Sequence, residues 1–259
     1  MVTLTDAPPR EEISLLASLT GGWLKLPLSI VRDVGPAAQT LGGILKISNR
    51  ETFVSASKVA ERVRLPLATV RKHLVMLHEQ GWIDNAGREH TRAGRARRTC
   101  TLKITTKTKA ALGEYGILPW WACSACRLPW SAKALLSFIM ANLAKFKKAA
   151  EGEDDLEDDL EADDDWFWLH LETLGGEDRF RFSLDRLTRE TGLSRPAIVK
   201  AKQRLAKLGI IEWNRYRRDD GGDILFPNPA FRVVVTPQSE GMVTLTFKVV
   251  GGNNLVRWE

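Results

Sequence analysis

The chain has 259 residues, 27% of them charged and 44% apolar, which is enough for one large domain or two ordinary ones and excludes fibrous and wholly disordered classes. It holds no run of about eighteen uncharged apolar residues that would span a membrane, and its first twenty residues are charged where a secretion signal is apolar. The net charge of +6 hides a more basic body: residues 151–165 hold eleven acidic and no basic residues, and removing those charges leaves +17.

This excess of positive charge favours association with nucleic acid, the abundant polyanion inside cells. The three cysteines, Cys100, Cys123 and Cys126, cannot all pair with one another, and a chain of this length needs no disulfide framework. These features fit a cytoplasmic protein, and we expect no membrane partner.

Residues 1–20 are predicted to be an N-terminal tail and residues 21–112 a first domain. In that domain Ser57 is placed to cap a short helix over residues 58–63, after which the chain turns. A second helix stops at Gly81, because glycine adopts the left-handed conformation that ends a helix at little cost. One side of this second helix is apolar, and the other side offers Thr69, Arg71, Lys72 and Val75.

A long basic hairpin is predicted next, with strands over residues 82–85 and 99–105. Its tip, residues 87–98, contains one acid, Glu89. Such a tip is either a solvated turn or a segment that lies along a phosphate backbone or enters a minor groove, and we favour the second interpretation. The arginines of the tip are Arg88, Arg92, Arg95, Arg97 and Arg98.

Residues 113–126 are predicted to be an apolar linker between two domains, since they contain Trp120 and Trp121. Cys123 and Cys126 form a single C-x-x-C pair, which is half of a zinc site. No second pair completes it. We therefore expect neither a metal nor another cofactor.

A second domain is predicted over residues 127–259, with an acidic insert at residues 151–165. Blocks of like charge repel and stay open, so the insert is interpreted as a solvated loop. Two alternatives remain: it imitates a phosphate backbone and docks on the protein's own basic surface, or it binds a basic protein partner. A C-terminal hairpin over residues 242–258 extends this domain's sheet or offers an edge for self-association into a homo-oligomer.

The most basic helix is predicted over residues 193–208, capped by Ser194 and stopped by Gly209. It carries no acidic residue. A solvated helix normally mixes charges of both signs, so these cations are expected to meet an external anion. The cations are Arg195, Lys200, Lys202, Arg204 and Lys207.

The two predicted helix pairs are copies of each other. Residues 58–83 align with residues 186–211 without a gap at a constant offset of 128, and Gly81 falls on Gly209. The chain is therefore predicted to hold two similar domains in tandem. Matched apolar positions include Val59 with Leu187, Val70 with Ile198, and Leu77 with Leu205.

This order of helix, turn, helix and strand pair resembles the winged-helix variant of the helix-turn-helix family. The motif covers Ser57 to Gly81 with a wing at Gly87 to Arg98, and Ser183 to Gly209 with a wing near Arg217 to Gly222. The resemblance implies an α+β fold of two tandem winged-helix domains. It also implies that the second helix of each motif enters the major groove while the wing touches the backbone or minor groove. The implied DNA-binding residues are Thr69, Arg71, Lys72, Arg92, Arg95, Arg97, Arg98, Arg195, Lys200, Lys202 and Gln203.

The sequence lacks a G-x-x-x-x-G-K-[ST] loop, an H-E-x-x-H pair and a G-x-S-x-G turn, so we expect no enzyme. The resulting hypothesis is a protein that binds double-stranded DNA, similar to replication initiators or transcription regulators of bacteria. Its wing arginines would supply phosphate contacts, and Arg195, Lys200 and Gln203 would supply base contacts. Two other classes stay open: a winged-helix scaffold for protein assembly and an RNA-binding subunit.

Overall fold

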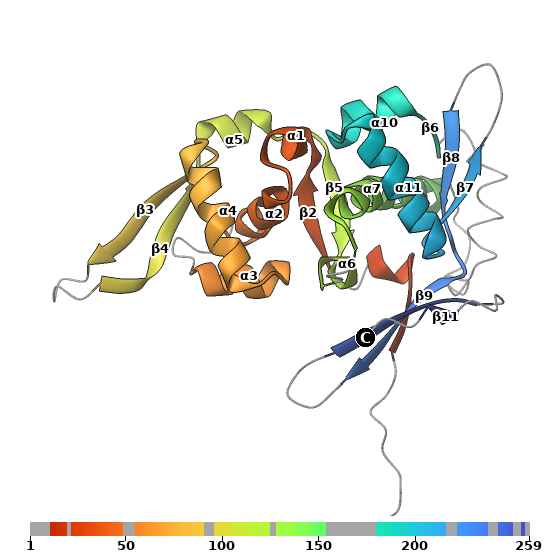
Figure 1. The fold of residues 1–259 in the computed structure, drawn as a ribbon, viewed down its shortest axis with the longest axis horizontal. Coiled ribbons are helices and arrows are strands. Elements are labelled where there is room, and N and C mark those ends of the chain that lie inside the picture. Colours follow the sequence, from red (N-terminus) through yellow and green to blue (C-terminus); the bar gives the residue numbers. More distant parts are fainter. Residues whose placement is uncertain are drawn as a thin grey trace, which may run out of the picture. The chain divides into compact units, whose positions relative to one another are not determined.

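The computed structural model describes residues 11–19, 22–48, 55–90, 96–124, 128–153, 180–215, 222–237, 243–250 and 255–256 (Figure 1). Helices and small antiparallel sheets alternate along the chain, so the fold is mixed α+β, as predicted.

The chain divides into two compact units. Unit 1 comprises Met1–Gly21, Asn142–Ser183 and Lys202–Glu259, and unit 2 comprises Gly22–Ala141 and Leu184–Ala201. Two helices, α7 (Trp130–Glu153) and α11 (Arg195–Lys207), pass from one unit into the other. The units therefore do not follow the boundaries predicted from the sequence at residues 112 and 127.

Unit 2 begins with strand β2 (Trp23–Pro27), which pairs antiparallel with β5 (Tyr115–Pro119). Helix α6 (Trp120–Ser124) follows β5, and its Trp121 is fully buried. Residues 115–124 thus form a strand and a helix of unit 2, whereas the sequence predicts an apolar linker over residues 113–126. In the sequence, β2 is followed by the 3-10 helix η2 (Leu28–Ile30) and by helices α1 (Val31–Val34) and α2 (Ala37–Ser48).

The first predicted helix pair is formed by α3 (Ala56–Val63) and α4 (Leu67–Glu79). The N-cap of α3 is Ser55, whose hydroxyl accepts a hydrogen bond from the backbone N–H of Lys58 at 3.1 Å. This corrects the prediction that Ser57 caps the helix. Ser57 lies within the first turn, and its hydroxyl oxygen is 2.9 Å from that of Ser55.

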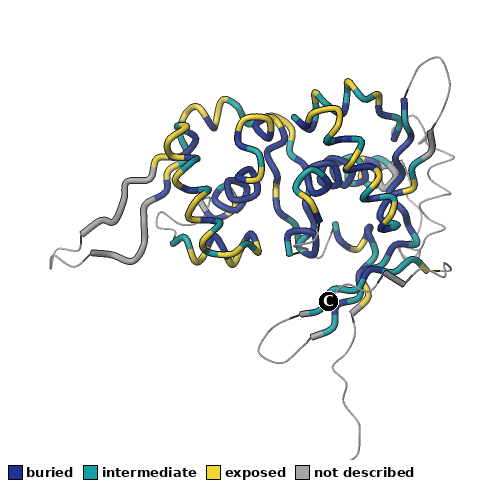
Figure 2. The backbone as a smooth tube through the Cα atoms, in the orientation of Figure 1, coloured by how far each residue is buried: buried dark blue, intermediate teal, exposed yellow. Residues whose placement is uncertain are grey.

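The second helix pair, α10 (Leu184–Thr191) and α11, has the bounds of the first pair shifted by 128 residues. The turns match as well: Arg64 and Gly192, which follow α3 and α10, have positive φ of 54° and 67°. Gly81 and Gly209, which follow α4 and α11, have φ of 73° and 70°. Exposed and buried residues alternate along these helices (Figure 2), so each buries one side. The sequence repeat is therefore also a repeat of backbone conformation.

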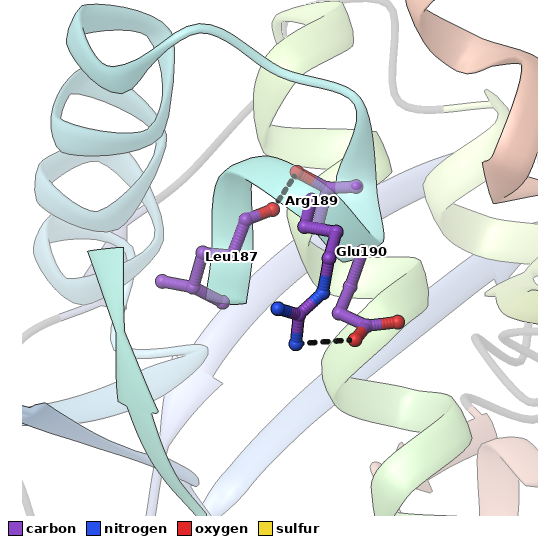
Figure 3. A network of polar contacts seen from close by, with 4 residues as sticks. Leu187, Arg189 and Glu190 are labelled. Carbon is purple, nitrogen blue, oxygen red and sulfur yellow. Dashed lines mark hydrogen bonds and ion pairs between the residues drawn. The ribbon is translucent and has the colours of Figure 1, made fainter. Parts of the chain in front are cut away.

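Thr191 stands in the second copy where Val63 stands in the first, and both are fully buried. A buried hydroxyl needs a hydrogen-bond partner. Thr191 Oγ1 donates to the Leu187 carbonyl oxygen at 2.6 Å, so the polar group is satisfied within α10 itself (Figure 3). Beside it, the Arg189 guanidinium lies 3.3 Å from the Glu190 carboxylate.

An antiparallel strand pair follows the first helix pair, as predicted. β3 (Ile83–His90) pairs with β4 (Ala96–Ile104), with Ile83 opposite Ile104 at the base. Both strands are longer than the sequence predicts, and their register shifts between Asn85 and His90. In Figure 1 the hairpin extends away from α3 and α4. Helix α5 (Thr106–Ala111) follows β4.

A strand pair follows the second helix pair too. β7 (Ile211–Arg215) pairs with β8 (Gly222–Pro227), and β6 (Arg181–Ser183) joins the other edge of β8. The result is a three-stranded sheet in the order β6–β8–β7.

The C-terminal hairpin is confirmed, since β10 (Val243–Val249) pairs with β11 (Leu255–Val256). It does not extend the β6–β8–β7 sheet. It joins β9 (Phe231–Pro237) and β1 (Glu11–Ser14) in a second sheet of unit 1, in the order β1–β9–β10–β11. Residues 11–14 are therefore a strand, which corrects the prediction that they belong to an N-terminal tail.

This second sheet packs against the end of α11. A Cβ atom on Gly209 would lie 2.5 Å from Val249 Cγ2, and the positive φ of Gly209 also favours glycine. Gly81 has the same backbone conformation, but a Cβ atom there would meet no atom of a described residue within 4 Å. The side chain of Val249 thus packs closely on the backbone of Gly209, and no described residue packs on Gly81 in the same way.

Candidate nucleic-acid interface

The outward side of α4 carries the polar residues predicted for DNA contact. Arg71 and Lys72 are exposed, Thr69 is half-buried, and Val75 is 54% exposed. Neither Arg71 nor Lys72 makes an ion pair within the part of the chain that the structure describes. Arg71, Lys72 and Val75 thus lie on the exposed side of α4, and their role in DNA contact stays a prediction. The buried residues of the opposite side are Val70, Leu74 and Leu77.

Helix α2 holds the first helix pair in place through two polar contacts. The Thr40 hydroxyl lies 2.7 Å from His73 Nδ1 of α4. Gln39 Nε2 donates to the Val63 carbonyl oxygen, at the end of α3, at 2.7 Å. Burial lowers the pKa of His73, because the imidazolium form is poorly solvated there. These contacts fix which side of α4 faces outward.

The outward side of α11 presents Arg195, Lys200 and Gln203, all exposed. Lys200 occupies the position of Lys72 in the first copy, and it makes no ion pair with a described residue. Arg195 Nη2, in contrast, lies 2.5 Å from the Asp185 carboxylate of α10. Both of these side chains are largely exposed, so the pair adds little stability. The prediction that the cations of this helix lack acidic partners within the chain is thus wrong for Arg195.

Lys202 does not belong to this surface, which corrects its prediction as a DNA-binding residue. Its side chain is 4% exposed and forms an ion pair with Asp223 of β8. Its Nζ also lies 5.0 Å from the ring centroid of Trp213 on β7. Lys202 holds the inward position that Leu74 holds in α4, and a charge at such a position requires a partner.

The predicted wing arginines are described only in part. Arg92 and Arg95 lie outside the described residues. Arg97 and Arg98 belong to β4, and the structure describes their backbone alone. The structure therefore places the strand that carries two of these arginines but none of the four side chains.

The base of the β3–β4 hairpin is fixed to the end of α4 by Thr105 and Lys107, which are not among the residues predicted from the sequence. The Thr105 hydroxyl donates to the carbonyl oxygens of Gly81 at 2.8 Å and Trp82 at 3.1 Å. Lys107 Nζ lies 4.2 Å from the Trp82 ring centroid and donates to the Gln80 carbonyl oxygen at 2.7 Å. Thr105 is also the N-cap of α5, a position that its residue type would have indicated.

The cysteine pair is described at one residue only. Cys123 is buried as a free thiol, and burial raises its pKa to about 12. Lys133 Nζ donates to its carbonyl oxygen at 3.0 Å. Cys126 lies outside the described residues, and no group of His, Cys, Asp and Glu side chains elsewhere in the described chain is arranged to hold a metal ion.

The acidic insert at residues 151–165 begins inside α7, which ends at Glu153, and its remaining residues lie outside the described ones. Among the described helices, none has the length and apolar composition needed to cross a membrane.

Comparison with known proteins gives no relative. No protein family matches the chain, and no curated protein or solved structure shows a significant similarity to it.

Proposed function

We propose that the chain binds double-stranded DNA through two winged helix-turn-helix domains, with α4 and α11 as recognition helices. The observation that carries this proposal is the repeat of the outward sides. Both helices have 13 residues, bury one side, and expose a lysine at the same position, Lys72 or Lys200. Neither lysine has an acidic partner among the described residues.

The dimensions of these helices suit the major groove of B-DNA. The groove is about 12 Å wide and admits an α-helix. A helix of this length spans about 20 Å, which covers several base pairs. Arg71, Arg195 and Lys200 are long side chains that reach base edges or phosphates from such a helix, and arginine and lysine pair well with guanine.

The β3–β4 hairpin is the wing of the first domain in this proposal. Thr105 and Lys107 tie its base to the end of α4, so the wing and the helix keep one relative orientation. Its arginines contact phosphates or the minor groove, where sequence-independent affinity arises. The contributing residues are Arg92, Arg95, Arg97 and Arg98.

The second domain depends more on its helix than on its wing. Asp219 and Asp220 follow Arg217 and Arg218 in the sequence of the second hairpin, which weakens attraction to phosphate. Asp223 of that hairpin is already paired with Lys202. Base contacts of this domain therefore come from Arg195, Lys200 and Gln203.

The biological role we propose is that of a cytoplasmic replication initiator or transcription regulator. The basic body, with +17 outside residues 151–165, attracts DNA of any sequence, and the two helices select the site. Binding is expected to weaken steeply as salt rises, because released counterions drive it.

Fluorescence anisotropy with a labelled random-sequence duplex tests this function. The double variant Arg71→Ala, Lys72→Ala is expected to bind more weakly than wild type. The control Lys145→Ala, Lys148→Ala removes the same charge from exposed positions of α7 and is expected to bind like wild type. Equal losses in both variants, or no binding to any duplex at low salt, would contradict the proposal. Stronger competition by structured RNA than by duplex DNA would reassign the chain to RNA binding.

A further inference from the structure

We propose that the two helices read different bases, thymine through Val75 of α4 and adenine through Gln203 of α11, so that the DNA target consists of two unlike subsites. This inference rests on the proposed DNA-binding function and adds the base that each helix prefers. It follows from one pair of equivalent positions, Val75 and Gln203, at which the exposed sides of α4 and α11 differ in chemistry.

Val75 and Gln203 are equivalent residues, 128 apart, in helices with equivalent bounds. Each follows the shared exposed lysine by three residues, Lys72 or Lys200, and residues three apart lie on the same side of a helix. Both helices thus expose a lysine. One turn later, α4 exposes an apolar side chain and α11 exposes an amide.

Val75 is exposed, although valine side chains are usually buried. Its exposed fraction is 54%, and Val250 is the only other large hydrophobic residue described as exposed. Valine is also a weaker helix former than alanine, arginine or glutamine, so helix stability does not explain it. An apolar side chain on a recognition helix has one distinctive partner in the major groove, the C5-methyl group of thymine.

Gln203 offers the complementary chemistry for adenine. Its amide holds one acceptor and a donor group, which match the N6 amino group and N7 of adenine in the major groove. The side chain is exposed and makes no hydrogen bond to another described residue. Its amide is therefore available for a base.

Two identical reading surfaces would favour a target in which one sequence occurs twice. Here the shared lysine attracts either subsite, but a valine makes no hydrogen bond to adenine and an amide gains little from the thymine methyl group. The difference between Val75 and Gln203 therefore distinguishes the two halves of the target and sets the direction in which the chain binds.

The test begins with duplexes selected by the wild-type protein from a random pool, followed by single-atom changes in the selected sequence. Replacing a thymidine with deoxyuridine (the deoxyuracil change) removes the C5-methyl group, and replacing adenine with 7-deaza-adenine removes N7. Wild type should lose about fourfold in affinity at one thymine, the effect of one buried methyl-sized group. It should lose about fivefold or more at one adenine.

The variants assign each loss to a residue. Val75→Ala should become insensitive to the deoxyuracil change while keeping the 7-deaza-adenine effect, and Gln203→Ala should show the reverse. Val75→Gln should gain preference for adenine at the first subsite. Both positions are exposed, and matching urea unfolding curves would show that the variants fold.

Deoxyuracil effects that persist in Val75→Ala, or wild-type binding without any base preference, would overturn this inference and leave duplex binding intact. Failure to bind any duplex would remove the proposed function as well.

Discussion

Lys202 of α11 occupies the core position that Leu74 occupies in α4, 128 residues earlier, and both are buried. Leu74 fills this place with an apolar side chain. Lys202 fills it with its alkyl stem, and its ammonium group reaches Asp223 of β8 and the ring of Trp213. The second copy therefore joins its helix to its hairpin by a buried charge pair.

Breaking this pair from one side is expected to be costly. Asp223→Ala leaves the Lys202 ammonium buried without its partner and should lower the free energy of unfolding by about 3 kcal/mol. The double variant Lys202→Leu, Asp223→Ala restores the chemistry of the first copy and should recover most of that loss. Urea denaturation measures both.

The control for this prediction is Asp185→Ala, which breaks the exposed pair with Arg195 and should change stability by about 0.5 kcal/mol at most. If Asp223→Ala and Asp185→Ala cost the same, Lys202 is not held as the structure describes.

The two glycines that end α4 and α11 are expected to differ in how much stability is lost when each is replaced by alanine. Gly81→Ala and Gly209→Ala both place a side chain at positive φ, which costs about 1 kcal/mol. Gly209→Ala also forces a Cβ atom against Val249, so it should lower the urea midpoint further than Gly81→Ala does. Val249→Ala should relieve part of the added cost. Equal effects of the two glycine changes would argue against the packing of β10 on α11.

Both helix pairs were predictable because apolar spacing and glycine stops depend only on neighbouring residues, and because the 128-residue offset is a direct match between two parts of the sequence. The residue type alone does not predict the inward orientation of Lys202, because charged side chains are ordinarily exposed. The alignment of Lys202 with Leu74 indicates the burial of Lys202 correctly, since these equivalent positions of the repeat are both buried.

The partners of β1 and β5 could not be predicted in the same way. β1 pairs with β9 across most of the length of the chain, and β5 pairs with β2 from the start of unit 2. Short strands of this kind are held by long-range backbone hydrogen bonds and by the packing of residues such as Trp121. These interactions leave little pattern in the sequence of the strand itself. The outward residues Arg71 and Lys200 were predictable, because they lie opposite a periodic apolar side.

Acid is expected to weaken the packing of α4 on α2. Burial holds the pKa of His73 below its ordinary value of 6.5, so the unfolded chain binds more protons than the folded one near that pH. This contribution to stability is present above 6.5 and is lost as the pH falls toward the lower folded pKa. Wild type should therefore lose more stability than His73→Gln between about pH 7 and about pH 5 in urea titrations. Parallel losses would contradict the buried environment of His73.

The Cys123 thiol is expected to be inert in the folded protein. Its pKa of about 12 leaves very little thiolate near neutral pH, and its side chain is buried. In a Cys100→Ser, Cys126→Ser variant, a thiol reagent such as Ellman's reagent should react slowly in buffer and completely in denaturant. Rapid reaction in buffer would show that Cys123 is accessible.

The most direct measurement for the DNA-binding account compares Lys200→Ala on a selected duplex and on a random duplex. The account predicts that the preference for the selected duplex falls by about 1–3 kcal/mol, since a base contact is lost. Lys207→Ala, which removes the same charge from the last turn of α11, should weaken both complexes alike. If Lys200→Ala weakens both duplexes equally, or neither, α11 does not read bases and the account is wrong.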